Sequence, residues 1–83
     1  MKKIHQQDAL RRRVQNFRKV ARWSQYALGN AAGIDRARIS FFECAYVALT
    51  DAEIERVETA MRDALGAARE ELASAEKALL ATG

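Results

Sequence analysis

Two arginines, Arg36 and Arg38, stand at the start of a short predicted helix and carry the most specific chemistry in this chain. A guanidinium group can donate two parallel hydrogen bonds to N7 and O6 of guanine, which discriminates against other bases by about 1–3 kcal/mol. The helix should begin after Asp35, a favourable N-cap, and bury Ile39 and Phe42. Both arginines then lie on its outward side, where they can reach a second molecule.

Another short helix precedes this one and would position it. Ser24 is a favourable N-cap for a helix that starts at Gln25, and Gly33 stands where the end of that helix requires a residue that tolerates positive φ. We therefore expect helices over residues 25–32 and 36–44. Two short helices joined by a glycine turn form a helix-turn-helix, whose second helix enters the major groove of DNA.

A longer amphipathic helix is predicted in front of this pair, over residues 8–21. Leu10, Val14 and Phe17 recur on one face at helical spacing. The opposite face, which we expect in water and in reach of phosphates, carries Arg11, Arg12, Arg13 and Lys19.

The rear of the chain predicts one long helix. Thr50 and Glu53 have the spacing of a capping box, in which each side chain accepts a hydrogen bond from the other's backbone N–H. No proline follows before Ala81, and the single glycine, Gly66, costs a helix only about 1 kcal/mol. We favour one helix through Gly66; the alternative is a break there that gives two shorter helices.

An apolar stripe runs along this rear helix. Leucines recur every seven residues and alternate with methionine or alanine, a pattern typical of a coiled coil. Its members are Met61, Leu65, Ala68, Leu72, Ala75 and Leu79. We expect the stripe to join two chains into a homodimer; the alternative is that it folds back against the first helix of the same chain.

Composition bounds the remaining classes. The 83 residues suit one small domain, and 49% hydrophobic residues without proline favour an all-α protein. Residues 1–50 carry ten Lys/Arg against three acids, a net charge of +7, and residues 51–83 carry −4, which suits a protein with one face on phosphates. Neither a signal peptide nor a membrane span is evident, so we expect a cytoplasmic, nucleoid-associated protein. With one cysteine, Cys44, one histidine, His5, and no catalytic motif, we expect no enzyme, metal or cofactor.

The stretch from Val14 to Met61 resembles the Cro/CI-type (XRE, lambda-repressor-like) helix-turn-helix domains. The matching residues are Arg18, Ser24-Gln25, Leu28, Gly33-Ile34, Ile39-Ser40, Phe42-Glu43, Ile54, Val57 and Met61. Four residues depart from the pattern, with Arg22 and Ala45 in place of glycine, Leu49 in place of proline and Gly29 in place of alanine. The resemblance implies a lambda-repressor-like helix-turn-helix bundle in residues 1–62. The apolar stripe of the rear helix predicts a helical extension for dimerisation in residues 63–83.

The resemblance also implies roles for single residues. It places the base-reading side chains on the second motif helix, at Arg36, Ala37, Arg38 and Phe41, although Phe41 is equally open to a place in the core or between subunits. It implies a structural ion pair between Arg18 and Glu43. Contacts to phosphates are expected around the motif, at the helix N-terminus and on both flanks, from Arg22, Ser24, Gln25, Ser40 and Tyr46.

These observations favour a dimeric transcriptional regulator that binds double-stranded DNA at an inverted-repeat operator, with half-sites about one helical turn (~10 bp) apart. We expect it to repress by blocking polymerase, while activation stays open. The alternative is a protein-interaction module, such as an antitoxin that neutralises a partner protein. The acidic rear helix suits that alternative, whereas two outward arginines favour DNA.

Overall fold

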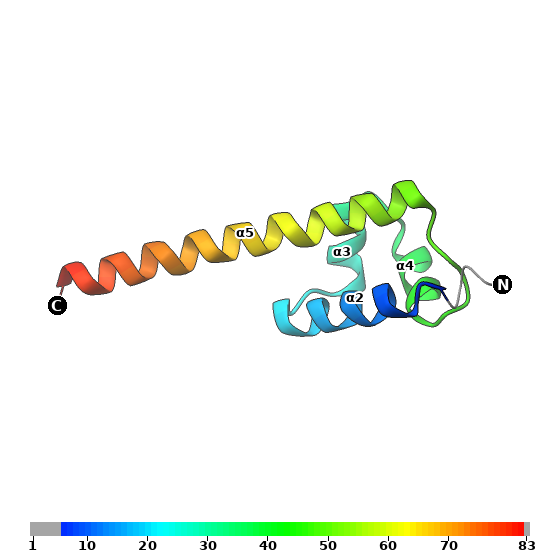
Figure 1. Ribbon diagram of the computed structural model, residues 1–83, viewed down its shortest axis with the longest axis horizontal. Helices are drawn as coiled ribbons and strands as arrows, with labels where there is room; N and C mark the ends of the chain where they lie inside the picture. The colour runs from blue at the N-terminus through cyan, green and yellow to red at the C-terminus, as the bar shows by residue number, and fades with distance from the viewer. Residues whose placement is uncertain (1–5, 83) are drawn as a thin grey trace.

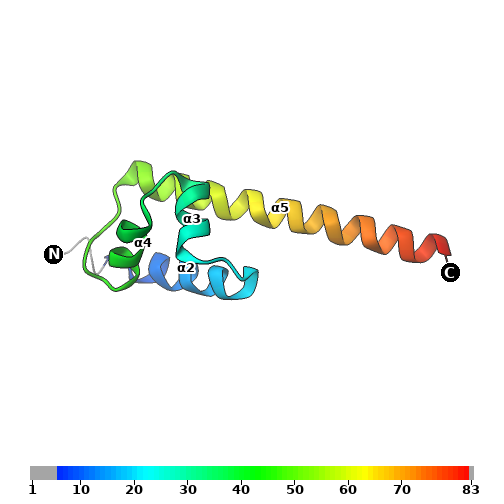
Figure 2. The same cartoon turned by 180° about the vertical axis from the view of Figure 1, so that it is seen from behind.

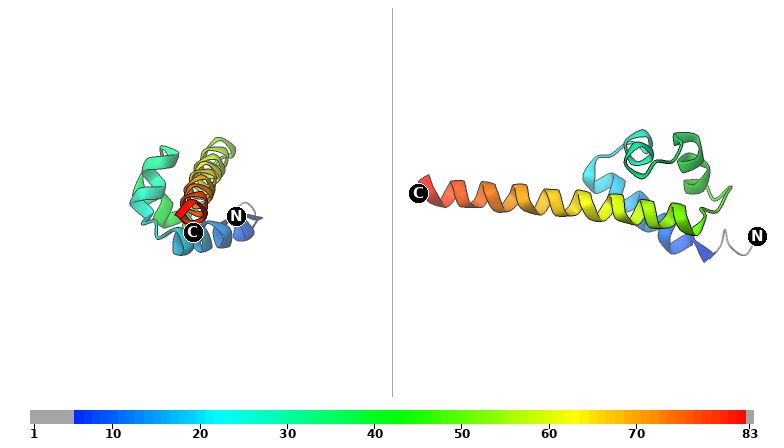
Figure 3. Two further views of the ribbon diagram at one scale, coloured as in Figure 1. Left: turned by 90° about the vertical axis from the view of Figure 1, so that its left-hand side faces the viewer. Right: turned by 90° about the horizontal axis from the view of Figure 1, so that it is seen from above.

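The computed structural model describes residues 6–82 and is all-helical over that range (Figure 1). Its helices are α2 (Asp8–Ala21), α3 (Gln25–Ala32), α4 (Arg36–Glu43) and α5 (Asp51–Thr82). The first three gather around the N-terminal half of α5, and the C-terminal half extends away from them (Figure 2; Figure 3). The molecule is therefore 57 Å long but only 21 × 19 Å across.

The sequence predicted these helices to within about a residue, and α5 continues through Gly66, which confirms one long helix. The capping box at its start is present as well. Thr50 Oγ1 accepts a hydrogen bond from the Glu53 N–H at 3.2 Å, and Glu53 Oε1 accepts one from the Thr50 N–H at 2.8 Å. None of the helices within residues 6–82 is long and apolar enough to cross a membrane.

The connection between α3 and α4 is tight. Ser24 Oγ caps α3 by accepting from the Ala27 N–H at 3.0 Å, and Gly33 ends the helix with φ 69°. A Cβ on Gly29 would lie 2.5 Å from the carbonyl oxygen of Ile34, closer than two such atoms can approach. Glycine at position 29 therefore permits the close crossing of α3 and the turn into α4.

Two residues that stand in place of glycine adopt the backbone conformation that glycine favours. Arg22 has φ 60° and Ala45 has φ 64°, and they are the non-glycine residues with positive φ among those described. Arg22 ends α2, and Ala45 follows the end of α4. A left-handed conformation costs an L-residue about 1–2 kcal/mol, so the surrounding fold must hold both loops in place.

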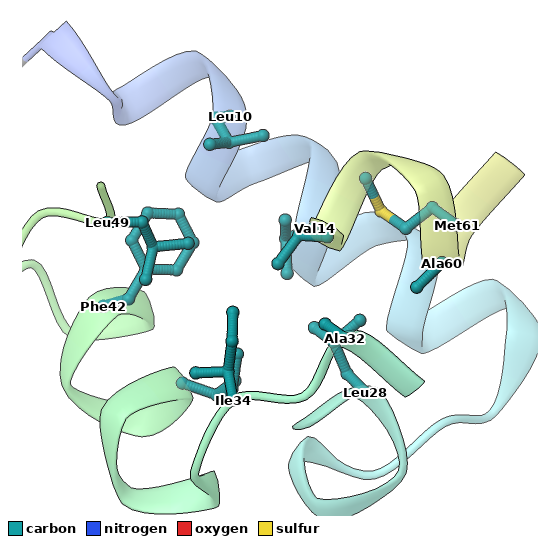
Figure 4. Close-up of a cluster of buried hydrophobic side chains, with 11 residues drawn as sticks. Leu10, Val14, Leu28, Ala32, Ile34, Phe42, Leu49, Ala60 and Met61 are labelled. Carbon is teal, nitrogen blue, oxygen red and sulfur yellow. The ribbon is translucent and has the colours of Figure 1, made fainter. Parts of the chain in front are cut away.

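One hydrophobic core joins all four helices (Figure 4). Its fully buried centre comprises Val14, Leu28, Ile39, Phe42, Leu49 and Val57. Met61 belongs to this core and is only 9% exposed. The prediction that Met61 lies in a seam between two chains is therefore wrong, because its side chain is already packed within its own chain.

Two polar side chains complete the core in ways the sequence did not indicate. Gln7 donates to the Leu49 carbonyl and accepts from the Leu49 N–H, both at 2.9 Å, and so ties the start of α2 to the α4–α5 loop. Arg11 is buried against the Phe42 ring, donates to the Phe42 carbonyl at 2.6 Å and pairs with Asp8. The expectation that Arg11 faces water is therefore wrong, because its guanidinium group is buried and paired with Asp8 in its own chain.

The apolar stripe on α5 leaves the core within its first heptad. Leu65 is 51% exposed and Leu72 is 70% exposed. From Ala67 onward the described side chains are all exposed. The alternative in which the stripe folds back against α2 is therefore wrong for Leu72, Ala75 and Leu79, whereas Leu65 and Ala68 line a groove beside the end of α2.

Candidate nucleic-acid interface

The outward side of α4 presents Arg36 at its first turn and Phe41 one turn later. Both side chains are exposed, while Ala37 and Ser40 are half-buried. Arg36 follows directly on Asp35, whose Oδ2 accepts from the Ala37 N–H at 3.1 Å and starts the helix. Arg36 makes no salt bridge to any residue of the described range. Its guanidinium group keeps its donors available for a ligand.

Arg38, unlike Arg36, is bound to other residues of its own chain. Its Nε and Nη2 donate to the two carboxylate oxygens of Glu53 at 2.6 and 2.8 Å, and Nη2 also donates to the Ala48 carbonyl at 3.1 Å. A fork-to-carboxylate pair of this kind holds both side chains in one geometry. The expectation that Arg38 reads bases is therefore wrong: the side chain ties α4 to the start of α5.

The same contact changes the titration of Glu53. The hydrogen bond from Arg38 lowers the pKa of the Glu53 carboxyl to about 2, helped by the Thr50 N–H, while burial opposes the shift. In turn, Glu53 raises the pKa of Arg38. Glu53 thus serves both as the capping-box acid of α5 and as the counter-ion of Arg38.

Arg18 and Glu43 form the ion pair that the family resemblance implies. Arg18 Nε and Nη2 donate to the Glu43 carboxylate at 2.7 and 2.6 Å, and Arg18 Nη1 donates to the Trp23 carbonyl at 3.0 Å. The hydrogen bond to Glu43 raises the pKa of Arg18. The pair locks the end of α4 to α2 and to the loop before α3, and so sets how α4 is presented.

The residues predicted to contact phosphates fall into two groups: some side chains form hydrogen bonds within the chain, and others are exposed. Gln25 Nε2 donates to Glu43 Oε1 at 3.2 Å, and the Ser24 hydroxyl caps α3. At the N-terminus of α3, what stays available is the backbone N–H groups and the positive end of the helix dipole. Arg22 and Tyr46 are exposed on the two flanks, and the Tyr46 ring lies 6.3 Å from that of Phe41.

Two polar residues of α3 face the same side and were missed in the sequence. Tyr26 and Asn30 are exposed and line a shallow surface hollow together with Asp35, Arg36 and Ala37. They lie four residues apart on the outward side of α3, so their spacing was the available signal. The hollow gives Arg36 neighbours that can donate and accept hydrogen bonds.

The positive charge of the front half is partly neutralised within the fold. Arg11, Arg13, Arg18 and Arg38 pair with Asp8, Glu58, Glu43 and Glu53, respectively. The exposed basic side chains in residues 6–50 that form no salt bridge are Arg12, Lys19, Arg22 and Arg36. Two of these four, Arg22 and Arg36, flank α3 and lie next to the candidate interface, whereas Arg12 and Lys19 lie on α2.

Within 6–82, no three His, Cys, Asp or Glu side chains are grouped to hold a metal ion. Cys44 is exposed at the end of α4, and His5 lies outside the described residues.

Comparisons with known proteins return no match, whether against family models, curated proteins or solved structures.

Proposed function

We propose that this protein is a sequence-specific DNA-binding transcriptional regulator, a dimeric repressor that binds an inverted-repeat operator. In this proposal residues 1–62 form a lambda-repressor-like helix-turn-helix bundle, and α4 lies in the major groove. Residues 63–83 of α5 extend from that bundle and join two chains. DNA binding requires no cofactor here, since the protein's own donors and charges make the contacts.

Arg36 carries the proposal. It is exposed at the first turn of α4, free of salt bridges within residues 6–82, and flanked by Tyr26 and Asn30 of α3. A recognition helix contacts base edges chiefly through its N-terminal residues, and arginine is the commonest reader of guanine. Ala37 and Phe41 would touch thymine methyl groups from the same face.

Backbone geometry lends further support. The helix-turn-helix pattern that the sequence resembles has glycine at positions 22 and 45, and Arg22 and Ala45 adopt the left-handed conformation at both. The ion pair between Arg18 and Glu43 stands where the same pattern has one. These features come from different parts of the chain, so their agreement favours the proposed bundle.

Phosphate contacts in the proposal come from two sides of α4. The N-terminus of α3 offers the backbone N–H of Gln25, and Arg22 precedes it on one flank. Tyr46 is exposed on the other flank, with Ser40 half-buried between them on α4. Contacts of this kind fix the register of the protein on the duplex, whereas Arg36 would supply specificity.

The second candidate is a protein-interaction module, such as an antitoxin. What favours it is the exposed aromatic pair Phe41 and Tyr46, together with the exposed leucines of α5. The internal role of Arg38 also leaves one outward arginine on α4 instead of two. DNA binding remains the better proposal, because Arg22 and Arg36 border α3 as exposed cations that form no salt bridge within residues 6–82, and the N-terminus of α3 adds the positive end of a helix dipole.

Selection from a library of random duplexes separates the two. A regulator enriches a single inverted repeat, and the Arg36→Ala variant loses that enrichment while it melts like the wild type. An interaction module enriches no motif. The control is Arg62→Ala, which removes the same charge from an exposed position on α5 away from α4.

A further inference from the structure

The C-terminal half of α5 exposes a stripe of apolar side chains. Leu72 is 70% exposed and Leu79 is 72% exposed, on a stretch where every described side chain from Ala67 onward is exposed. An isolated helical segment of this length is marginally stable in water, and apolar contacts normally support it. A solvent-facing stripe of leucines on such a segment marks an interface.

An apolar groove continues this stripe onto the body of the protein. It lies between the end of α2, which contributes Phe17 and Val20, and α5, which contributes Leu65 and Ala68. Trp23 also lines it, with its ring edge-on to that of Phe17 at a centroid distance of 5.2 Å, and Glu71 of α5 is a charged residue of its lining. The groove and the stripe form one surface, which we name the α5 face: Phe17, Val20, Trp23, Leu65, Ala68, Leu72, Ala75 and Leu79.

We propose that the α5 face binds α5 of a second copy of this chain in antiparallel orientation, so that the last turns of each α5 lie along the groove of the other. Side-chain size alternates along this seam in a way that favours the antiparallel orientation. With Leu72 opposite the partner's Ala75 and Ala68 opposite the partner's Leu79, every layer pairs one large and one small side chain. A parallel pair instead alternates leucine on leucine with alanine on alanine, and two straight helices cannot close both gaps.

Charge complementarity selects the same orientation. In the antiparallel register, Arg69 flanks the seam opposite the partner's Glu76, and two-fold symmetry repeats the pair. In a parallel coiled coil, Glu71 instead meets the partner's Glu76, and symmetry repeats that repulsion. Each helix carries both members of this pair, Arg69 and Glu76, so a two-fold axis forms the same favourable contact twice.

The arrangement also sets the distance between the two DNA-binding faces, and this consequence rests on the proposed function. Glu53 is salt-bridged to α4, and 41 helical positions separate the two copies of it in the antiparallel register, or about 61 Å. That distance is nearer two turns of B-DNA (~70 Å) than the single turn expected from the sequence. For a duplex that lies along α5, the half-sites should be about two turns apart.

Disulfide trapping tests the orientation without DNA, so its outcome is independent of the proposed function. Cys44→Ser provides a background without thiols, into which Ala68→Cys and Leu79→Cys are introduced on separate chains, one of them carrying a size tag. Both positions are exposed and lie outside the core. In the antiparallel dimer the two copies of position 68 lie about 16 Å apart, beyond the ~7 Å limit for a disulfide, whereas positions 68 and 79 face each other.

The expected result is a disulfide between the Ala68→Cys and Leu79→Cys chains in the mixture, and none for Ala68→Cys alone. Cross-linking of Ala68→Cys to itself would establish a parallel dimer and overturn the proposal. A chain that forms neither species and stays monomeric by light scattering at high micromolar concentration would overturn self-association altogether.

Glu76→Arg supplies a second readout that needs no cysteine. It should raise the dimer dissociation constant several-fold, because it places like charges at both Arg69 contacts. In a parallel dimer the same substitution removes the repulsion from Glu71, so tighter association would contradict the antiparallel arrangement.

Discussion

Arg36 and Arg38 stand two residues apart on α4, and the structure predicts opposite phenotypes for their substitution. Arg38→Ala removes a bidentate ion pair and a bond to the Ala48 carbonyl. It also leaves the Glu53 carboxylate, whose side chain is only 14% exposed, with hydrogen bonds from Thr50 alone. Buried pairs cost about 3–5 kcal/mol to break and exposed pairs about 0–1.

Because the Arg38 side chain is 37% exposed, we expect an intermediate loss of about 1.5–2.5 kcal/mol. In a domain of this size such a loss lowers Tm by roughly 6–20 °C. Arg36→Ala, at an exposed position without a salt bridge, should change stability by less than about 0.5 kcal/mol. Thermal and urea unfolding followed by circular dichroism measure both. Equal melting of Arg38→Ala and wild type would refute the assignment of Arg38 to the α4–α5 contact.

Acid unfolding gives an independent check on the same pair. The folded-state pKa of Glu53 is lowered to about 2, from an ordinary value near 4.5. Its contribution to stability is therefore fully present above about pH 4.5 and is lost as pH falls from there towards 2. Glu53→Gln should be less stable at neutral pH and should flatten the pH dependence within that window. An unchanged acid profile in Glu53→Gln would contradict the lowered pKa.

Three further outcomes are expected. Ala45→Gly should stabilise the fold by about 0.5–1 kcal/mol, because it relieves a left-handed backbone, whereas Ala52→Gly inside α5 should destabilise it; equal signs in urea unfolding would argue against the strain. Gly29→Ala should lower stability by about 1 kcal/mol or more, since its Cβ meets the Ile34 carbonyl, and a raised Tm would exclude that close approach. Binding to duplex DNA should weaken with salt at a log–log slope near −6, for about three or four phosphates per subunit, and a slope near zero would favour the protein-interaction candidate.

The helices themselves were predictable, because each carries its start and stop signals locally. Ser24, Asp35 and the Thr50–Glu53 box lie within three residues of the backbone groups that they cap. The turn at Gly33 was equally visible, since positive φ is a local requirement of a helix end. Signals of this kind need no knowledge of the tertiary fold.

The roles of the charged and polar side chains were less predictable, because their partners are distant in sequence. Arg36 and Arg38 look alike on a helical wheel. Glu53 lies fifteen residues after Arg38, and its place in a capping box already accounts for a glutamate there, so nothing in the sequence indicated that it pairs with Arg38. Gln7 and Leu49 are separated by 42 residues, and no local pattern links them. The heptad stripe likewise includes Met61, and its spacing alone does not tell whether Met61 belongs to the domain core or to a seam between chains.

The central claim is that Arg36 on the outward side of α4 reads DNA bases. The most direct measurement is fluorescence anisotropy of wild type, Arg36→Ala and Arg62→Ala on the selected duplex and on a scrambled duplex, at fixed salt. We expect Arg36→Ala to lose about 5–150-fold in affinity per half-site on the selected duplex and far less on the scrambled one. Arg62→Ala should bind both duplexes nearly as wild type does. Equal affinities of Arg36→Ala and wild type for the selected duplex would contradict the claim.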